Sequence, residues 1–402
     1  EILSAHQVAF ILTLCGGHVS PILVGCRRRG VRVIDVRHEA TAVFAADAVA
    51  RLTGRPGVAV VTAGPGVTNT VTAVKNAQSA QSPVVLLGGA TATALKGRGA
   101  LQDIDQRALM EPHVKWAASA KRLRDLAPLV HRAFEEALRG VPGPVFVECP
   151  VDLLYPEQVV RDWYQGRSGA GGSLWQRLLN RYLQHHVHRL FAADRGSRGL
   201  TPRAVSPPLP EAGQVRRAAG ALARAERPVL LVGSQALLEA GEAGRVAGAV
   251  AGLGVPVFLS GMARGLLGRG HPLQCRHKRK DALRDADVVI LAGLPSDFRL
   301  GYGRQFGSAT KLIAANRSRR DLQLNRRPDL ALHCDAGRFL RQLAHLCAFE
   351  PGRWDRWQAR LRAVDDEGEQ EIERQSLLSV DHLNPLRLCR EIDRVIGPDG
   401  VV

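Results

Sequence analysis

The sequence lacks the marks of several protein classes. No stretch reaches the roughly 18 to 20 uncharged apolar residues that a membrane-spanning helix needs, and nothing resembles a signal peptide. Its seven cysteines include no Cys-x-x-Cys pair. Neither a zinc site nor a disulfide framework is therefore indicated. Because the chain begins at Glu1 without methionine, we expect any N-terminal anchor of the protein to be missing from this sequence.

Acidic residues are scarce relative to basic ones, 38 against 55, which gives a formal net charge of +17. Such a charge can indicate nucleic-acid binding. Here the basic residues are mostly arginines, spread among many alanines and glycines without interleaved aromatic residues. We therefore expect no nucleic-acid partner and favour compositional bias of the gene as the cause of the positive charge. A second interpretation is that arginines in the middle of the chain bind an anionic ligand, such as a nucleotide or the phosphates of coenzyme A.

One glutamate stands between an apolar strand pattern and an Ala-rich helix pattern. The run Val31–Val36 has branched residues on both faces, as in a parallel strand covered by helices on both sides. Glu39 follows, and good helix formers then continue to a stop at Gly54. A second apolar run, Val58–Thr62, ends in a Gly-Pro-Gly turn at 64–66. Together these patterns predict a β-α-β unit. From its position alone, Glu39 is better explained as an acid in the first turn of a helix, where the macrodipole favours negative charge.

Apolar runs alternate with helical patterns along the whole chain, which is typical of an α/β protein. We predict two doubly wound parallel-sheet domains. The first spans residues 1–160, and a linker with an amphipathic helix follows at 161–210. The second domain spans residues 211–350. Residues 351–402 form a further linker and the start of a third domain that the sequence truncates.

The linker helix has a clear apolar stripe. Its large apolar side chains recur at helical spacing. They are Leu174, Trp175, Leu178, Leu179, Tyr182, Leu183, Val187, Leu190 and Phe191. The basic residues interspersed among them are Arg177, Arg181, His185, His188 and Arg189. Packing against the protein's own surface explains such a stripe. A basic amphipathic helix can instead lie on an anionic membrane.

Two long segments carry a family resemblance. RHEATAVFAADAVAR and AGPGVTNTVTAVKNAQSAQSPVVLLGGA resemble the pyrimidine-binding domain of thiamine-diphosphate enzymes of the acetolactate synthase superfamily. Within it, CGGHVSPILVGC, GRGALQDIDQ, VECPVDLLYP and GMARGLLGR are similar to the acetolactate synthase-like proteins of animals, the type 2 2-hydroxyacyl-CoA lyases. Residues 211–350 resemble the superfamily's central domain.

The resemblance implies roles for individual residues. Glu39 would be the catalytic residue that hydrogen-bonds N1′ of the cofactor's pyrimidine ring. The loop beside the cofactor would comprise Gly64, Pro65, Gly66 and Asn69, although a plain strand-to-helix turn also explains its glycines. Gln102, where relatives read Phe-Gln-Glu, would line the substrate channel. Gly17 would let the backbone approach a ligand closely, or would only form a turn.

The implied activity is cleavage of a long-chain 2-hydroxyacyl-CoA to formyl-CoA and an aldehyde one carbon shorter, a step of fatty acid alpha-oxidation. The alternatives are an acetolactate synthase-type carboligase and a non-catalytic scaffold protein. The cofactors would be thiamine diphosphate and Mg²⁺. The magnesium ligands belong to the family's third domain, so we expect no metal site in this chain and inactivity of this fragment by itself.

Further expectations concern assembly, location and the central domain. The family's active site lies between the first domain of one subunit and the third domain of another, which implies a homodimer or tetramer. The implied location is the endoplasmic reticulum membrane, with surface contact through 174–191.

In the central domain, relatives bind FAD or ADP beside an acidic residue after a strand. Asn316 stands there in this chain, which speaks against dinucleotide binding.

Overall fold

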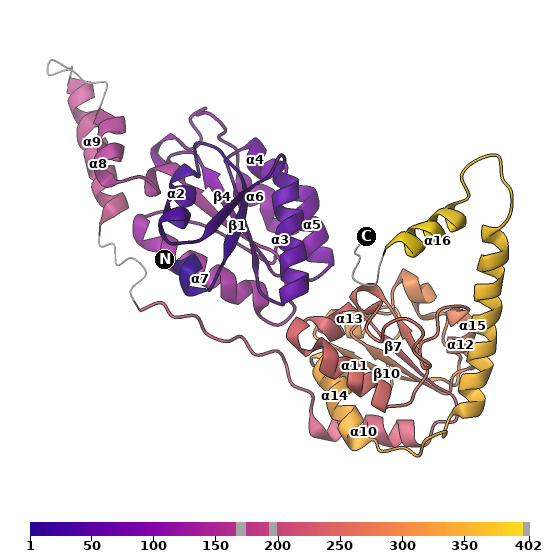
Figure 1. Cartoon of the computed structure of the whole chain (residues 1–402). Coiled ribbons are helices and arrows are strands. Elements are labelled where there is room, and N and C mark those ends of the chain that lie inside the picture. Colours follow the sequence, from indigo (N-terminus) through magenta and orange to yellow (C-terminus); the bar gives the residue numbers. More distant parts are fainter. Residues whose placement is uncertain (166–173, 193–198, 397–402) are drawn as a thin grey trace. The chain divides into compact units, whose positions relative to one another are not determined.

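The computed structural model describes residues 1–165, 174–192 and 199–396. The chain divides into two compact units, Glu1–Pro207 and Pro208–Val402, each of which is described by itself (Figure 1). The predicted start of a third domain after Gly397 lies outside the described residues. Within the described ranges, no helix has both the length and the apolar character needed to cross a bilayer.

The first unit is built on a six-stranded parallel sheet in the order β2-β1-β3-β4-β6-β5. Its strands are β1 (Phe10–Leu14), β2 (Arg32–Asp35), β3 (Gly57–Val61), β4 (Val84–Ala90), β5 (Trp116–Ser119) and β6 (Val145–Pro150). The residues of β3, β4 and β6 are all buried, as expected for inner parallel strands covered on both faces.

Helices cover both faces of this sheet. The helices of the unit are α1 (Ile2–Ala5), α2 (Ser20–Arg28), α3 (Glu39–Thr53), α4 (Pro65–Thr68), α5 (Val71–Ser79), α6 (Gln106–Met110), α7 (Leu123–Leu138), α8 (Glu157–Gln165) and α9 (Leu174–Phe191). One core cluster joins α2 and α7 to one face, and a second joins α3 and α5 to the other. The α3 helix lies so close that a Cβ on Gly57 would be 2.0 Å from the Ala46 carbonyl oxygen.

The structure corrects the sequence interpretation of β2. This strand lies at the edge of the sheet, and its residues are only half-buried or exposed rather than covered on both faces. The inner place beside β3 belongs to β1, which the sequence showed only as an apolar run. The connection from β2 through α3 to β3 therefore crosses over β1. A five-residue apolar run does not reveal by itself whether it forms a strand, so this insertion was not predictable from periodicity.

The second unit has a five-stranded parallel sheet in the order β11-β10-β9-β7-β8. Its strands are β7 (Pro228–Val232), β8 (Val257–Leu259), β9 (Val288–Ala292), β10 (Lys311–Asn316) and β11 (Leu330–His333). Its helices are α10 (Ala212–Ala223), α11 (Ala243–Gly252), α12 (Arg279–Asp285), α13 (Arg319–Leu322), α14 (Ala336–Leu346), α15 (Asp355–Ser376) and α16 (Pro385–Val395).

Two apolar clusters form the core of this unit, one on each face of the sheet. The first packs α10, α11 and α14 against it, and the second packs α12 and α15. The indole N–H of Trp357 donates to the Pro228 carbonyl at 3.0 Å, which ties α15 to the start of β7. Both sheets are parallel and covered on two faces, so the predicted fold class of two doubly wound α/β domains is confirmed.

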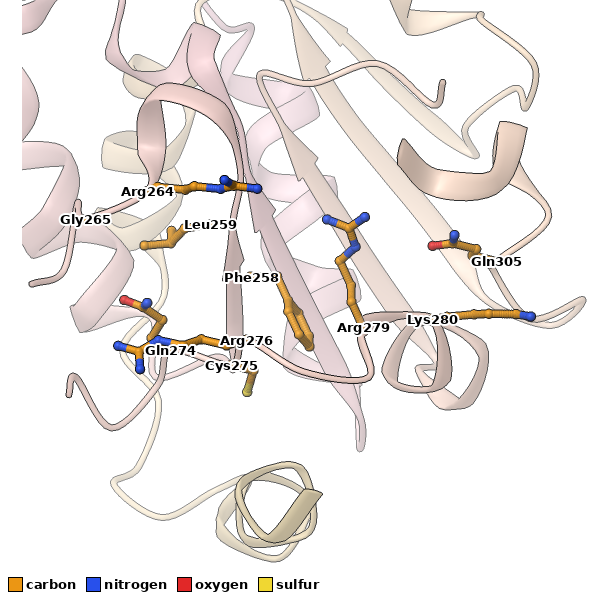
Figure 2. Close-up of a pocket in the computed structure, with 10 residues that line it drawn as sticks. All are labelled: Phe258, Leu259, Arg264, Gly265, Gln274, Cys275, Arg276, Arg279, Lys280 and Gln305. Carbon is orange, nitrogen blue, oxygen red and sulfur yellow. The ribbon is translucent and has the colours of Figure 1, made fainter. Parts of the chain in front are cut away.

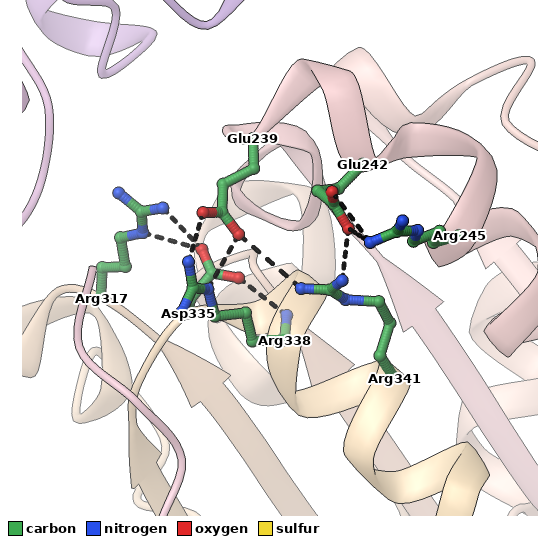
Figure 3. A network of polar contacts seen from close by, with 7 residues as sticks. All are labelled: Glu239, Glu242, Arg245, Arg317, Asp335, Arg338 and Arg341. Carbon is green, nitrogen blue, oxygen red and sulfur yellow. Dashed lines mark hydrogen bonds and ion pairs between the residues drawn. The ribbon is translucent and has the colours of Figure 1, made fainter. Parts of the chain in front are cut away.

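An ion-pair network holds the segment after β7 to α14 (Figure 3). Arg317 pairs with Asp335 at 2.7 Å, and both side chains are almost fully buried. Arg338 donates two hydrogen bonds to Glu239, at 2.7 and 2.9 Å, and these bonds keep the pKa of Glu239 below its usual value. At the end of β10, Asn316 is buried and its Oδ1 accepts from the Ser318 N–H. Asn316 thus caps its own loop, at the position where relatives were expected to carry an acidic residue beside a nucleotide.

Candidate active site

Three parallel strand ends bring the predicted site segments to one edge of the first sheet. β2 leads to Glu39, β1 leads to Gly17, and β3 leads to the loop at Gly64–Gly66. Because β2, β1 and β3 are neighbours in the sheet, their carboxyl ends lie side by side. In open α/β sheets, ligands bind in the crevice outside these ends.

Glu39 is the first residue of α3, where its carboxylate is buried and fixed. The His38 imidazole caps the helix by accepting from the Ala40 N–H at 3.1 Å. The Glu39 side chain is only 7% exposed. Its Oε2 accepts a hydrogen bond of 3.0 Å from the Asn69 amide. No described residue donates to Oε1, which is therefore available to a ligand.

The loop that contains Gly64, Pro65 and Gly66 lies against this carboxylate. Gly64 has φ 62° and ψ −114°, a conformation that side chains disfavour, and Pro65 begins the short helix α4. A Cβ on Gly66 would be 2.7 Å from Thr62 Cγ2 and 3.7 Å from Glu39 Oε1. Only glycine therefore fits at position 66, between Thr62 and the Glu39 carboxylate. The structure brings Glu39, Gly66 and Asn69 together.

Gln102 and Gly17 occupy different positions at this edge. Gln102 has φ 61° and packs on the Gly64 loop, since a Cβ on Gly64 would be 2.8 Å from Gln102 Cβ. A Cβ on Gly17 would meet nothing within 4 Å, so its backbone borders open space. Gly16 differs, because a Cβ there would overlap Thr62. The close approach at Gly16 is therefore to Thr62, the residue that follows β3.

The sequence interpretation missed Gln106, which fixes the Gly64 loop. Its side chain is 1% exposed. The Oε1 atom accepts from the Gly64 N–H at 2.8 Å, and the Nε2 atom donates to the Gly89 carbonyl at 2.9 Å and to Glu148 at 3.1 Å. Lys96 completes the group with an ion pair of 3.0 Å to Glu148. Nothing local in GALQDIDQ distinguishes this glutamine from Gln102, because its partners come from the loop after β3, from β4 and from β6.

The described residues hold no group of three or more His, Cys, Asp or Glu side chains suited to bind a metal. The thiols are all free, and five of them are buried. Burial raises the pKa of Cys149 and Cys275 to about 12, so these thiols stay protonated near neutral pH.

The second unit has a cationic cavity of about 650 Å³ beside β8 and α12 (Figure 2). Its walls include Arg264, Arg276, Arg279 and Lys280, and Phe258 contributes an apolar surface. Burial and the positive charge of Arg264 lower the pKa of Arg279 below its usual range. Arg279 is partly buried, whereas Arg264, Arg276 and Lys280 are exposed. A cluster of cations around a cavity favours an anionic ligand. The interpretation that mid-chain arginines bind a phosphate-bearing group stays a prediction, and this cavity is its candidate site.

Comparisons with known proteins agree with this arrangement. Residues 1–109 match the family described as "Thiamine pyrophosphate enzyme, N-terminal TPP binding domain", and residues 215–343 match "Thiamine pyrophosphate enzyme, central domain". Proteins named 2-hydroxyacyl-CoA lyase 2 from Danio rerio and Caenorhabditis elegans are 46% and 47% identical over the whole chain. The chain spans 65% and 64% of their lengths. A "Probable acetolactate synthase" of Mycobacterium bovis is 34% identical over 78% of the chain and 51% of its own length.

Proposed function

The chain belongs to the thiamine pyrophosphate enzyme family, and we propose that it serves a thiamine-diphosphate-dependent carbon-carbon lyase that cleaves 2-hydroxyacyl-CoA. The products would be formyl-CoA and an aldehyde one carbon shorter, as in fatty acid alpha-oxidation. The greater identity to proteins named 2-hydroxyacyl-CoA lyase 2 than to the acetolactate synthase favours the lyase over the carboligase.

The observation that carries the proposal is the buried Glu39 carboxylate with one oxygen held and the other available. The residues present fit the pyrimidine end of thiamine diphosphate. Asn69 holds Oε2 at 3.0 Å, and the Gly66 backbone lies close to Oε1. When bound, thiamine diphosphate supplies a carbon acid whose conjugate carbanion attacks a carbonyl group.

The protein's contribution follows from this geometry. Glu39 Oε1 would hold a proton shared with the pyrimidine N1′, because a buried carboxylate of fixed orientation can pass a proton to a hydrogen-bonded ring nitrogen. Asn69 keeps that carboxylate from rotating. Gln106 holds the Gly64 N–H, so the loop keeps its position when the ring binds.

Other parts of the proposal concern the intact protein. Mg²⁺ and the cofactor's diphosphate would be held by a third domain, as the family resemblance implies. A homodimer or tetramer would complete the active site. The enzyme would reside at the endoplasmic reticulum membrane, and residues 174–191 are suited to contact the membrane surface. Cell fractionation and sedimentation equilibrium test the location and the oligomeric state.

The test of the activity is product analysis by mass spectrometry with the full-length protein. A long-chain 2-hydroxyacyl-CoA should give formyl-CoA and the shortened aldehyde, and Glu39→Gln should lower the rate about 10²- to 10⁴-fold, as for loss of a general acid/base group. The folded state of the variant is checked by its melting temperature. Acetolactate from pyruvate without any aldehyde would establish the carboligase, and no product from either substrate would favour the scaffold.

A further inference from the structure

The paired helices α8 and α9, here called the helical arm, are attached firmly to the first unit at one end only. Figure 1 shows the two helices side by side, projecting from the body of the unit. Near its C-terminal end, α9 buries Val187 and Leu190, which are 1% and 3% exposed. Leu190 belongs to a small core cluster with Ala120 and Leu153. The arm therefore has a packed base.

A buried polar cluster adds to the attachment at this base. Asp152 is fully buried and accepts hydrogen bonds from the Thr93 hydroxyl at 2.5 Å and the Tyr164 hydroxyl at 3.0 Å. Tyr164 lies on α8. His186 on α9 contacts the same Thr93 hydroxyl at 2.8 Å. Burial raises the pKa of Tyr164, so its hydroxyl remains a donor. Tyr164 of α8 thus bonds to the Asp152 carboxylate directly, and His186 of α9 is joined to it through the Thr93 hydroxyl.

The far end of the arm presents an apolar surface to solvent. The exposed stripe consists of five large side chains that are 53% to 80% exposed, namely Leu174, Trp175, Leu178, Leu179 and Tyr182. At about 100° per residue, these five fall within an arc of roughly 140° on α9. A contiguous apolar surface on a firmly attached element indicates an interaction site.

The charge of α9 distinguishes between two possible partners of the exposed stripe, a second copy of the chain and an anionic bilayer. The helix has no Asp or Glu, and Arg177 and Arg181 are exposed along one flank of the stripe. A symmetric contact between two copies would bring these arginines together with no acidic residue of α9 to neutralise them. Trp and Tyr favour the bilayer interface, and flanking arginines attract anionic headgroups.

We propose that the helical arm inserts its exposed stripe into the interfacial region of an anionic bilayer, with Arg177 and Arg181 at the headgroups. The base, fixed through Asp152, then holds the sheet domain at a constant orientation to the lipid surface. This inference rests on the membrane contact proposed above for residues 174–191 but is independent of the proposed catalysis, since neither the stripe nor the Asp152 cluster includes a predicted active-site residue. Vesicle binding measured without substrate tests it separately.

The first experiment measures partition of the chain onto vesicles of phosphatidylcholine, with and without phosphatidylserine. The variant Trp175→Ser/Leu179→Ser should lower the partition coefficient about tenfold or more per side chain, because both lose their apolar contact with lipid. The melting temperature should stay unchanged, because both side chains are exposed. Leu52→Ser is the matched control, since Leu52 is 77% exposed on α3 of the same unit and should leave partition unaltered.

The second experiment isolates the charge. Arg177→Gln/Arg181→Gln should weaken binding to the anionic vesicles about tenfold and leave binding to phosphatidylcholine unchanged. Arg216→Gln/Arg217→Gln on α10, also exposed, is the control for a general loss of charge.

Several outcomes overturn the proposal. One is absence of binding to either kind of vesicle, and another is equal binding by the stripe variant and the parent. A lowered melting temperature of the stripe variant would mean that the stripe is packed in solution. Light scattering that shows a parent dimer and a monomeric stripe variant would assign the stripe to a contact between copies.

Discussion

Replacement of Gln106 by leucine should destabilise the first unit without altering its apolar core. The substitution keeps the approximate size of the side chain but removes its hydrogen bonds to Gly64, Gly89 and Glu148. Each buried polar group left without its partner costs about 1 to 3 kcal/mol. Three such groups, each at the lower end of this range, give about 3 kcal/mol, which corresponds to a fall of roughly 6 to 12 °C in melting temperature for a domain of about 200 residues.

The matched control is Gln102→Leu, four residues earlier. The Gln102 side chain is half-buried and makes no hydrogen bond to a described residue, so this variant should melt within about 2 °C of the parent. Scanning calorimetry measures both variants in the full chain. Hydrogen-exchange mass spectrometry of peptides from β3 and β4 assigns the shifted transition to the first unit. Equal shifts for the two variants would refute the role of Gln106 as the residue that holds the Gly64 loop.

Two further predictions use titration and binding. His6 stacks on Phe134, and burial lowers its pKa to about 4 from 6.5, so the unfolded state takes up a proton first as pH falls. The first unit should be most stable above pH 6.5 and lose stability as the pH falls to about 4. In urea titrations across this range, the unfolding free energy of His6→Leu should depend less on pH than that of the parent. In the cationic cavity, Arg279→Gln should reduce binding of ADP or coenzyme A about tenfold in calorimetry, because one charged hydrogen-bond donor is lost. Unchanged affinity would mean that these ligands bind elsewhere.

The sequence alone placed Glu39 correctly between a strand and an Ala-rich helix. Local signals sufficed, since apolar runs of strand length alternate with helix formers and Gly54 ends α3 in the left-handed conformation. The same kind of signal predicted a helix over 174–191, because a 3.6-residue period needs no information beyond the helix itself.

Tertiary structure decided which residues share a site and which side chains are covered. Asn69 is 30 residues from Glu39, and Gln106 is 42 residues from Gly64, so these hydrogen bonds depend on strand order that no local pattern encodes. The order itself places β1 between β2 and β3, which a short apolar run does not reveal. On α9, one continuous stripe is exposed at Trp175 and buried at Leu190, because only the end near Asp152 meets the body of the unit. Periodicity defines the face of a helix, whereas burial depends on what packs against it.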